Sequence, residues 1–231
     1  MILERKQRIE IPDITQQNES FFQVAGSGSP RESFREFTEL MQIYSAAMKS
    51  VSTKLEVLDE ELQISRKHNP IHHLECRIKG INSIFKKLQR YGVPVSLNSA
   101  REHIRDIAGI RVICNFIDDI YLIENILLKQ PDITLLMRKD YISGPKGNGY
   151  RSLHLVIKAP VFLTHKIEYV PVEIQLRTVA MDYWASLEHM LRYKNEADTQ
   201  KYSTMLINCS NVLAETEKTM QHIREGIESD Y

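Results

Sequence analysis

The chain has 231 residues, of which 42% are hydrophobic and 26% are charged. This composition can bury one sizeable core without help from metals or disulfides. Lys and Arg number 30, as do Asp and Glu, so the formal net charge is zero. A neutral chain lacks the positive field that is typical of duplex-binding proteins, and we expect no DNA partner.

The cysteines and the apolar runs indicate the compartment. Cys76, Cys114 and Cys209 form an odd set without metal-ligand spacing, which favours free thiols in a reducing cytosol. No apolar run approaches the ~20 residues that span a bilayer. Residues 1–10 are too charged for the apolar segment of a signal peptide. We therefore expect a cytoplasmic protein with no membrane partner.

The first part of the chain predicts a tail followed by a long helix. Residues 1–29 mix polar residues with a Gly-Ser-Gly-Ser stretch at 26–29, a composition that predicts a flexible tail. Ser29, Pro30 and Glu32 match a helix start with a capping box. The apolar residues that follow step by three and four, the 3.5-residue repeat of a helix seam. They are Phe34, Phe37, Met41, Tyr44, Met48, Val51, Leu55, Leu58 and Leu62.

Two further helical stretches are predicted outside the central region. One runs from about Pro70 to Arg90, before the break at Gly92 and Pro94. The other covers 199–228 and repeats the three-and-four stepping of the first seam. Its apolar side consists of Tyr202, Leu206, Cys209, Leu213, Thr216, Met220, Ile223 and Ile227. The two seams pair within the chain or between subunits, and their length favours a homo-oligomer.

The period changes from helical to extended at Ala108. Residues rich in Val, Ile, Leu and Tyr predict strands. We expect strands at 110–116, 133–141, 150–158 and 167–178, with helices at 118–129 and 179–193. One crossover helix, then successive strands, then helices, favours an α+β fold with a mixed β-sheet and long flanking helices.

A cluster of basic residues precedes the predicted strands. Arg77, Lys79, Lys86, Lys87 and Arg90 fall within four turns of the predicted helix over 70–90. A triphosphate suits such a cluster. A charge run on its own is more often a solvated helix face, so this alternative stays open.

Two carboxylates adjoin or lie in predicted strands. Asp106 lies in Arg105–Arg111, a turn of small residues that leads into a strand. Period two sends Glu173, Gln175 and Arg177 to the face opposite the apolar residues of their own strand. Each feature alone also fits an ordinary turn or a half-exposed strand. Two carboxylates on neighbouring strands suit Mg²⁺, which takes oxygen ligands and few protein groups.

A glycine-rich loop lies between the two carboxylates. It contains Lys146 and Asn148 and leads into Tyr150, whose flat ring suits a nucleobase. By alternation, Tyr150, Ser152 and His154 share one face of the predicted strand. The loop matches no Walker or Rossmann fingerprint.

Three histidines raise the question of a transition metal. His68, His72 and His73 lie close together in the sequence. Neither cysteines nor carboxylates complete a tetrahedral ligand set around them, and we expect no structural zinc site.

Five short motifs follow one another between 68 and 189. They are His-Asn-Pro-Ile at 68–71, Asp-Ile-Ala-Gly-Ile-Arg at 106–111, Gly-Tyr-Arg-Ser-Leu-His at 149–154, Glu-Ile-Gln-Leu-Arg-Thr at 173–178 and Trp-Ala-Ser-Leu-Glu-His at 184–189. Together they resemble the synthetase domain of the RelA/SpoT homologue superfamily, in particular its small alarmone synthetases. The resemblance implies a nucleotidyltransferase-like synthetase domain over 68–194, with helical extensions over 30–67 and 195–231.

The resemblance also implies roles for individual residues. Asp106 and Glu173 would hold Mg²⁺, and Glu173 would accept the proton of the attacking ribose hydroxyl. The ATP side would consist of Arg77, Lys79, Lys87, Arg90 and Arg111. Tyr150 would stack on guanine, and the rest of the GTP or GDP side would consist of Lys146, Asn148, His154, Gln175 and Arg177.

The implied reaction transfers pyrophosphate from ATP to the ribose 3′-hydroxyl of GDP or GTP, giving ppGpp or pppGpp and AMP in the stringent response. The chain has no His-Asp dipeptide, the metal motif of the family's hydrolases, so we expect no hydrolysis. The flanking helices resemble those that build homotetramers. Two alternatives stay open: a nucleotide- or RNA-binding regulator without catalysis, and a nucleotidyltransferase that moves AMP and releases pyrophosphate.

Overall fold

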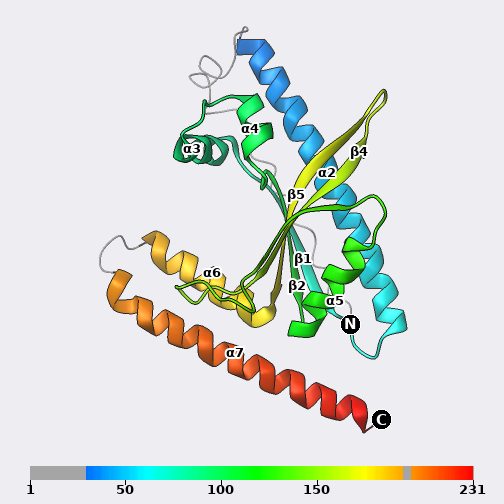
Figure 1. The fold of residues 1–231 in the computed structure, drawn as a ribbon, viewed down its shortest axis with the longest axis vertical. Helices are drawn as coiled ribbons and strands as arrows, with labels where there is room; N and C mark the ends of the chain where they lie inside the picture. The colour runs from blue at the N-terminus through cyan, green and yellow to red at the C-terminus, as the bar shows by residue number, and fades with distance from the viewer. Residues whose placement is uncertain (1–29, 195–198, 231) are drawn as a thin grey trace.

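A mixed five-stranded sheet with helices on both sides forms the protein (Figure 1). The computed structural model describes residues 30–194 and 199–230. The strands are β1 (Ile71–Ile78), β2 (Ala108–Cys114), β3 (Thr134–Asp140), β4 (Leu153–Phe162) and β5 (Ile167–Thr178). The helices are α2 (Pro30–Ser65), α3 (Ile81–Tyr91), α4 (Leu97–His103), α5 (Ile117–Leu128), α6 (Val179–Lys194) and α7 (Thr199–Ser229). The predicted α+β fold with a mixed sheet is confirmed.

The strand order is β1-β2-β5-β4-β3. β2, which follows Asp106, and β5, which contains Glu173, are therefore neighbours in the sheet. β2 and β5 are parallel, and the other neighbours are antiparallel. Gly109 is opposite Glu173, and Arg111 and His154 are both opposite Gln175. Residues opposite one another share a face of the sheet. The polar side chains of β2, β4 and β5 therefore lie on one face.

Helix α2 covers the apolar face of the sheet. It packs on β1, β2, β4 and β5, and its seam residues Tyr44, Met48, Val51 and Leu55 are almost fully buried. The predicted seam is therefore confirmed from Phe37 onwards, whereas the side chain of Phe34 lies outside the described residues. Pairing of this seam with the C-terminal seam within the chain, one of the two alternatives, is wrong. A one-sided apolar stripe fits a sheet as well as a helix, and α2 packs on the sheet rather than on α7.

The helix predicted from Pro70 to Arg90 is wrong over its first half. Residues 71–78 form β1, which pairs antiparallel with β2 from Ile71 to Ile78. Gly80 then precedes α3, a separate helix that buries Ile81, Ile84 and Leu88. Helix α4 was not predicted from the sequence, although Ser96 accepts a hydrogen bond from the Ser99 amide at its start. Pairing with β2 decides the conformation of residues 71–78.

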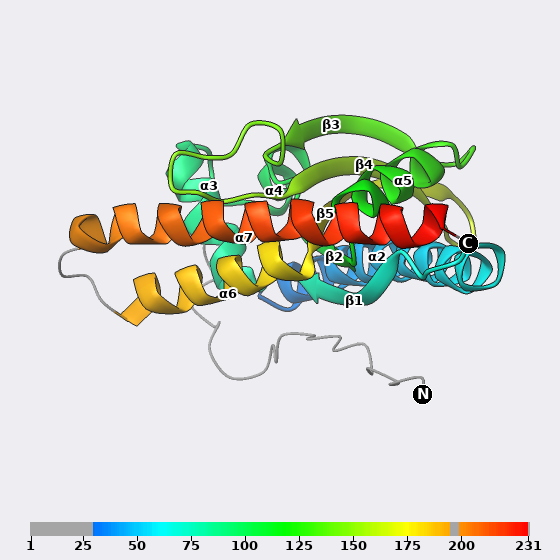
Figure 2. The ribbon, with the colours of Figure 1, turned by 90° about the horizontal axis from the view of Figure 1, so that it is seen from below.

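Helix α7 lies beside α6 and reaches α5 (Figure 2). At its far end, Arg224 forms two hydrogen bonds with Asp118 at 2.6 and 3.1 Å. His68 lies between the two helices, 2.8 Å from Asp119 Oδ1 and 3.1 Å from Glu228 Oε1. His68 therefore joins α5 and α7, away from His72 and His73 on β1.

Within residues 30–194 and 199–230, no helix is both long and apolar enough to cross a bilayer. The predicted tail at 1–29 lies outside the described residues. The proposed domain limits at 67 and 194 stay predictions.

Candidate active site

A cavity of about 680 Å³ opens on the polar face of the sheet, beside β1, β2 and β5. It brings together both predicted carboxylates and several of the predicted cations. Its charged and polar lining includes Glu75, Arg77, Lys79, Asp106, Arg111, Glu173 and Gln175. All of these residues except Glu75 were predicted from the sequence as site residues.

Asp106 precedes β2 and lies between two ammonium groups. Its Oδ2 atom is 2.7 Å from Lys79 Nζ and 2.7 Å from Lys87 Nζ. Burial raises the pKa of this carboxyl, but the hydrogen bonds and charges of Lys79 and Lys87 outweigh burial and lower it. Oδ1 is buried and has no hydrogen-bond partner in the described part of the chain. An ionised carboxylate with one free oxygen suits a divalent cation.

Glu173 lies on β5 opposite Gly109. Gln175 Nε2 donates to its Oε2 atom at 2.9 Å, and His154 Nδ1 lies 3.7 Å from Oε1. Burial raises the pKa of Glu173, but His154 and Gln175 together lower it below its usual value. The carboxylate is thus ionised at neutral pH and can accept a proton.

These two carboxylates are the groups best suited to a metal. Among the described residues, no cluster of three or more His, Cys, Asp or Glu side chains has the geometry of a metal site. Mg²⁺ commonly takes only one or two protein carboxylates and completes its shell with water and substrate phosphates. Asp106 and Glu173 fit that pattern, because Asp106 keeps an oxygen free.

Several of the residues predicted to bind the acceptor nucleotide gather at the N-terminal end of β4. Tyr150 Oη lies 2.8 Å from His154 Nε2, and Arg177 Nη2 donates to Oη at 2.7 Å. Lys146 Nζ lies 4.4 and 4.7 Å from the ring centroids of Tyr141 and Tyr150. A flat ring with its hydroxyl fixed on one side is a suitable surface for a base.

Ser152 does not belong to this group, contrary to the predicted alternation. The strand begins at Leu153 instead of Tyr150. Ser152 is fully buried, and its hydroxyl donates to the Leu176 carbonyl at 3.1 Å. Alternation holds only inside a regular strand, and 150–152 lie before it.

The basic residues come from three elements instead of one helix face. Arg77 lies on β1, Lys79 lies in the loop after it, and Lys87 lies on α3. Arg90 is exposed near the end of α3 and does not line the cavity. The prediction that these residues share one helix face is therefore wrong. The fold nevertheless brings Arg77 and Lys79 into the cavity, and Lys87 reaches Asp106 in its lining.

Asp182, which was not predicted from the sequence, contacts both Arg177 and Arg111. Arg177 Nη1 donates to Asp182 Oδ1 at 2.9 Å, and Arg111 Nη1 lies 3.4 Å from the same oxygen. Arg111 also donates to Glu75 at 2.7 Å. In the sequence, Asp182 looks like an ordinary acidic residue in the first turn of a helix. No pattern distinguishes it, because its partners lie on two strands.

Helix α7 packs directly on the glycine-rich loop before β4 at Gly149. Gly149 has φ +91°, and a Cβ atom there would lie 3.1 Å from Ser210 Cβ and 3.3 Å from Ile207 Cα. The Ser210 hydroxyl donates to the Gly149 carbonyl at 2.5 Å. Trp184 Nε1 donates to the Leu206 carbonyl at 2.9 Å. The C-terminal helix thus fixes the backbone that carries Tyr150.

We expect Gly149→Ala to lower the free energy of unfolding by about 1–3 kcal/mol. Gly147→Ala is the matched control, because nothing lies within 4 Å of its added Cβ and its φ is not positive. We expect that variant to change stability by less than about 0.5 kcal/mol. Thermal or denaturant unfolding checks both. Equal effects of the two variants would contradict the packing of α7 on the loop.

The family of the chain follows from its similarity to known proteins. Residues 76–198 match the family described as "Region found in RelA / SpoT proteins". The chain belongs to the RelA/SpoT family. The matched segment contains every residue that the sequence analysis placed in the site.

Two relatives from Bacillus subtilis (strain 168) within the RelA/SpoT family cover most of the chain. GTP pyrophosphokinase YwaC is 48% identical over 162 residues, which is 70% of this chain and 77% of that protein. GTP pyrophosphokinase YjbM is 33% identical over 186 residues, which is 80% of this chain and 87% of that protein. The chain is therefore similar to short members of the RelA/SpoT family along most of their length.

Solved structures of RelA/SpoT proteins share the fold. The small alarmone synthetase 2 from Bacillus subtilis has a TM-score of 0.75 and 41% identity, and the match covers 83% of this chain and 99% of that one. The small alarmone synthetase 1 from Bacillus subtilis, bound to its product pppGpp, has a TM-score of 0.77 and 32% identity over 84% and 98%.

Proposed function

We propose that the chain is a GTP pyrophosphokinase that transfers the β,γ-pyrophosphate of ATP to the ribose 3′-hydroxyl of GDP or GTP. One observation carries the proposal. An ionised Glu173 and an ionised Asp106 with a free oxygen line one cavity that also contains several cations. The GTP pyrophosphokinases YwaC and YjbM, similar to this chain over most of its length, support it.

The donor half of the site neutralises phosphate charge. Arg77, Lys79 and Arg111 line the cavity, and Lys87 joins them at Asp106. These side chains would bind the ATP triphosphate and orient it for in-line attack. Arg90 belongs to this half only if the substrate reaches the end of α3. Mg²⁺ held by Asp106 and Glu173 would neutralise the charge that builds up on the transferred phosphates.

The acceptor half of the site holds the guanine nucleotide. Tyr150 would offer its ring to the base. Lys146 Nζ lies 4.7 Å from the centroid of this ring, the Tyr150 amide donates to Asn148 Oδ1, and His154 Nε2 contacts the Tyr150 hydroxyl. Arg177 and Gln175 connect Tyr150 to Glu173 through hydrogen bonds at 2.7, 2.9 and 2.9 Å. Ring and carboxylate are thus fixed in one network, which positions the ribose relative to the base.

The reaction follows from these two halves. The 3′-oxygen of the acceptor attacks the β-phosphorus of ATP, and the bond from that phosphorus to the oxygen bridging to the α-phosphorus breaks. AMP leaves with that oxygen. The proton of the 3′-hydroxyl passes to Glu173, whose low pKa keeps the carboxylate ionised before attack.

Product analysis tests the proposal against its alternatives. Purified protein is incubated with Mg²⁺ and ATP plus GDP, ATP plus GTP, or either nucleotide alone, and anion-exchange chromatography resolves the products. We expect AMP with ppGpp or pppGpp only when both nucleotides are present. Release of pyrophosphate would support AMP transfer. Saturable binding without any product would support a binding regulator.

We propose that the protein is a cytoplasmic homo-oligomer, and a tetramer in particular. One face of α7 exposes a row of large apolar side chains at three-and-four spacing, typical of a helix interface. Its members are Tyr202, Met205, Val212, Met220, Ile223 and Ile227, each 49–66% exposed. Copies of the same chain would cover this row.

The three described cysteines are free thiols, which suits a reducing compartment such as the cytoplasm.

We expect Met220→Asp combined with Ile223→Asp to reduce the oligomer to at most half its mass, because charges would enter the apolar interface. His222→Asp is the control, since His222 lies between them in sequence but 89% of its side chain is exposed on another side of α7. Size-exclusion chromatography with light scattering measures the mass. An unchanged mass in the double variant would place the interface elsewhere.

A further inference from the structure

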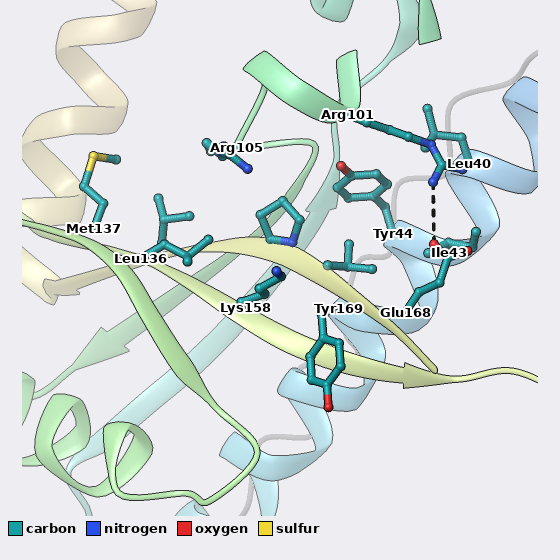
Figure 3. Close-up of a pocket in the computed structure, with 13 residues that line it drawn as sticks. Leu40, Ile43, Tyr44, Arg101, Arg105, Leu136, Met137, Lys158, Glu168 and Tyr169 are labelled. Atoms are coloured by element: carbon teal, nitrogen blue, oxygen red, sulfur yellow. Dashed lines mark ion pairs between the residues drawn. The ribbon is translucent and has the colours of Figure 1, made fainter. Parts of the chain in front are cut away.

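A second hollow, of about 540 Å³, lies outside the cavity that contains Asp106 and Glu173 (Figure 3). It is bounded by α2, α4, the loop after α4, and parts of β3, β4 and β5. The two hollows share no lining residue. They are close in the chain, because Arg105 lines this hollow and the next residue, Asp106, lines the other.

The charges around this hollow are unbalanced. Arg101, Arg105 and Lys158 face a single carboxylate, Glu168. Arg101 Nη1 lies 3.6 Å from Glu168 Oε2, and Lys166 Nζ lies 2.5 Å from Glu168 Oε1. Glu168 thus already forms ion pairs with two cations, Arg101 and Lys166. Neither Arg105 nor Lys158 has a carboxylate within 4.0 Å in the part of the chain that the structure describes.

A buried tyrosine hydroxyl points into the same space. Tyr44 is only 3% exposed, and its hydroxyl is directed between Arg101 and Arg105 (Figure 3). Burial raises the pKa of Tyr44, and the two guanidinium groups oppose that effect. The phenol therefore remains protonated and is a hydrogen-bond donor at the base of the hollow.

The wall of the hollow that β3, β4 and β5 form is largely apolar, and Lys158 lies on it too. Leu136, Met137, Val156 and Pro171 line it, and Tyr169 adds an exposed ring whose centroid lies 5.9 Å from Lys158 Nζ. Planar guanidinium groups bind phosphate oxygens in pairs, and flat apolar walls suit an aromatic base. The volume falls in the range of small-molecule sites.

We propose that this hollow binds a nucleotide at a second site, with its phosphates at Arg101, Arg105, Lys158 and the Tyr44 hydroxyl and its base on the apolar wall. The site adjoins the cavity of Asp106 and Glu173, since Val156 pairs with Glu173 across β4 and β5, but it shares no lining residue with that cavity. It requires neither of the two carboxylates of the active site.

Calorimetry on a chain with both substrate sites filled tests this proposal. Protein saturated with Mg²⁺, α,β-methylene ATP and GDP is titrated with UTP, and separately with inorganic pyrophosphate. We expect one UTP to bind per chain, more tightly than pyrophosphate. Absence of UTP binding overturns the proposal. Pyrophosphate binding as tight as that of UTP overturns the assignment of a base to the apolar wall.

Two variants test which residues bind UTP. We expect Arg101→Ala combined with Lys158→Ala to weaken binding at least about ten-fold, and Tyr44→Phe to weaken it about two- to ten-fold. Arg66→Ala combined with Lys129→Ala is the control, because it removes two exposed cations elsewhere. UTP affinity unchanged in both test variants, or reduced equally in the control, overturns the site.

Discussion

Glu173→Gln should lower the rate of pyrophosphate transfer by about 10²–10⁴-fold or more, because it removes the proton acceptor and one charge from the metal site. Both nucleotides should still bind, since the substituted amide has the same shape and Tyr150 and the cations are untouched. Steady-state kinetics measures turnover and KM, and equilibrium dialysis measures binding.

The control for this variant is Glu102→Gln. Glu102 lies on α4, outside the cavity, and 73% of its side chain is exposed. We expect it to leave turnover unchanged. A fully active Glu173→Gln enzyme would contradict the role of Glu173 as base and metal ligand.

Asp106→Asn should lower turnover by at least about 10²-fold, because the metal loses a charged ligand and Lys79 and Lys87 lose their common partner. In EDTA the variant should bind ATP no more weakly than the wild type, since a carboxylate that repels phosphate is gone. The combination of lower turnover with undiminished metal-free binding separates a metal ligand from a residue that binds ATP directly.

Asp118→Asn is the matched control for Asp106. Asp118 is also paired, with Arg224, and hydrogen bonds from Arg224 likewise lower its pKa against the effect of burial. It lies on α5, outside the cavity. If both variants lose activity equally, general loss of an ion pair explains the result and the metal role of Asp106 is wrong.

The polar orientation of Glu173 and the place of Asp106 beside β2 could be predicted from local features, whereas the pairing of β2 with β5 brings the two carboxylates together. Period two places Glu173 on the polar face of its strand, and a turn of small residues leaves Asp106 next to β2. Gln175 and Arg177 follow from the same alternation and do contact one another, with Arg177 Nη2 2.9 Å from Gln175 Oε1. The prediction failed at Ser152, where the regular strand had not yet begun.

Long-range contacts decided what the sequence analysis missed. Ile71, Leu74, Ile78 and Ile81 are spaced as on one side of a helix, yet residues 71–78 pair with β2. The partner of the α2 seam is a sheet assembled from four separate segments. Asp182 gains its position only when β2, β5 and α6 meet. None of these contacts leaves a periodic signal in the local sequence.

The most direct measurement of the central proposal follows the label of ATP carrying ³²P at the β-phosphorus. The protein is incubated with this ATP, Mg²⁺ and unlabelled GDP, and the products are separated and digested to locate the label. We predict labelled phosphate in the 3′-diphosphate of the guanine nucleotide and unlabelled AMP. Label released as free pyrophosphate, with adenylate transferred to the acceptor, would contradict pyrophosphate transfer.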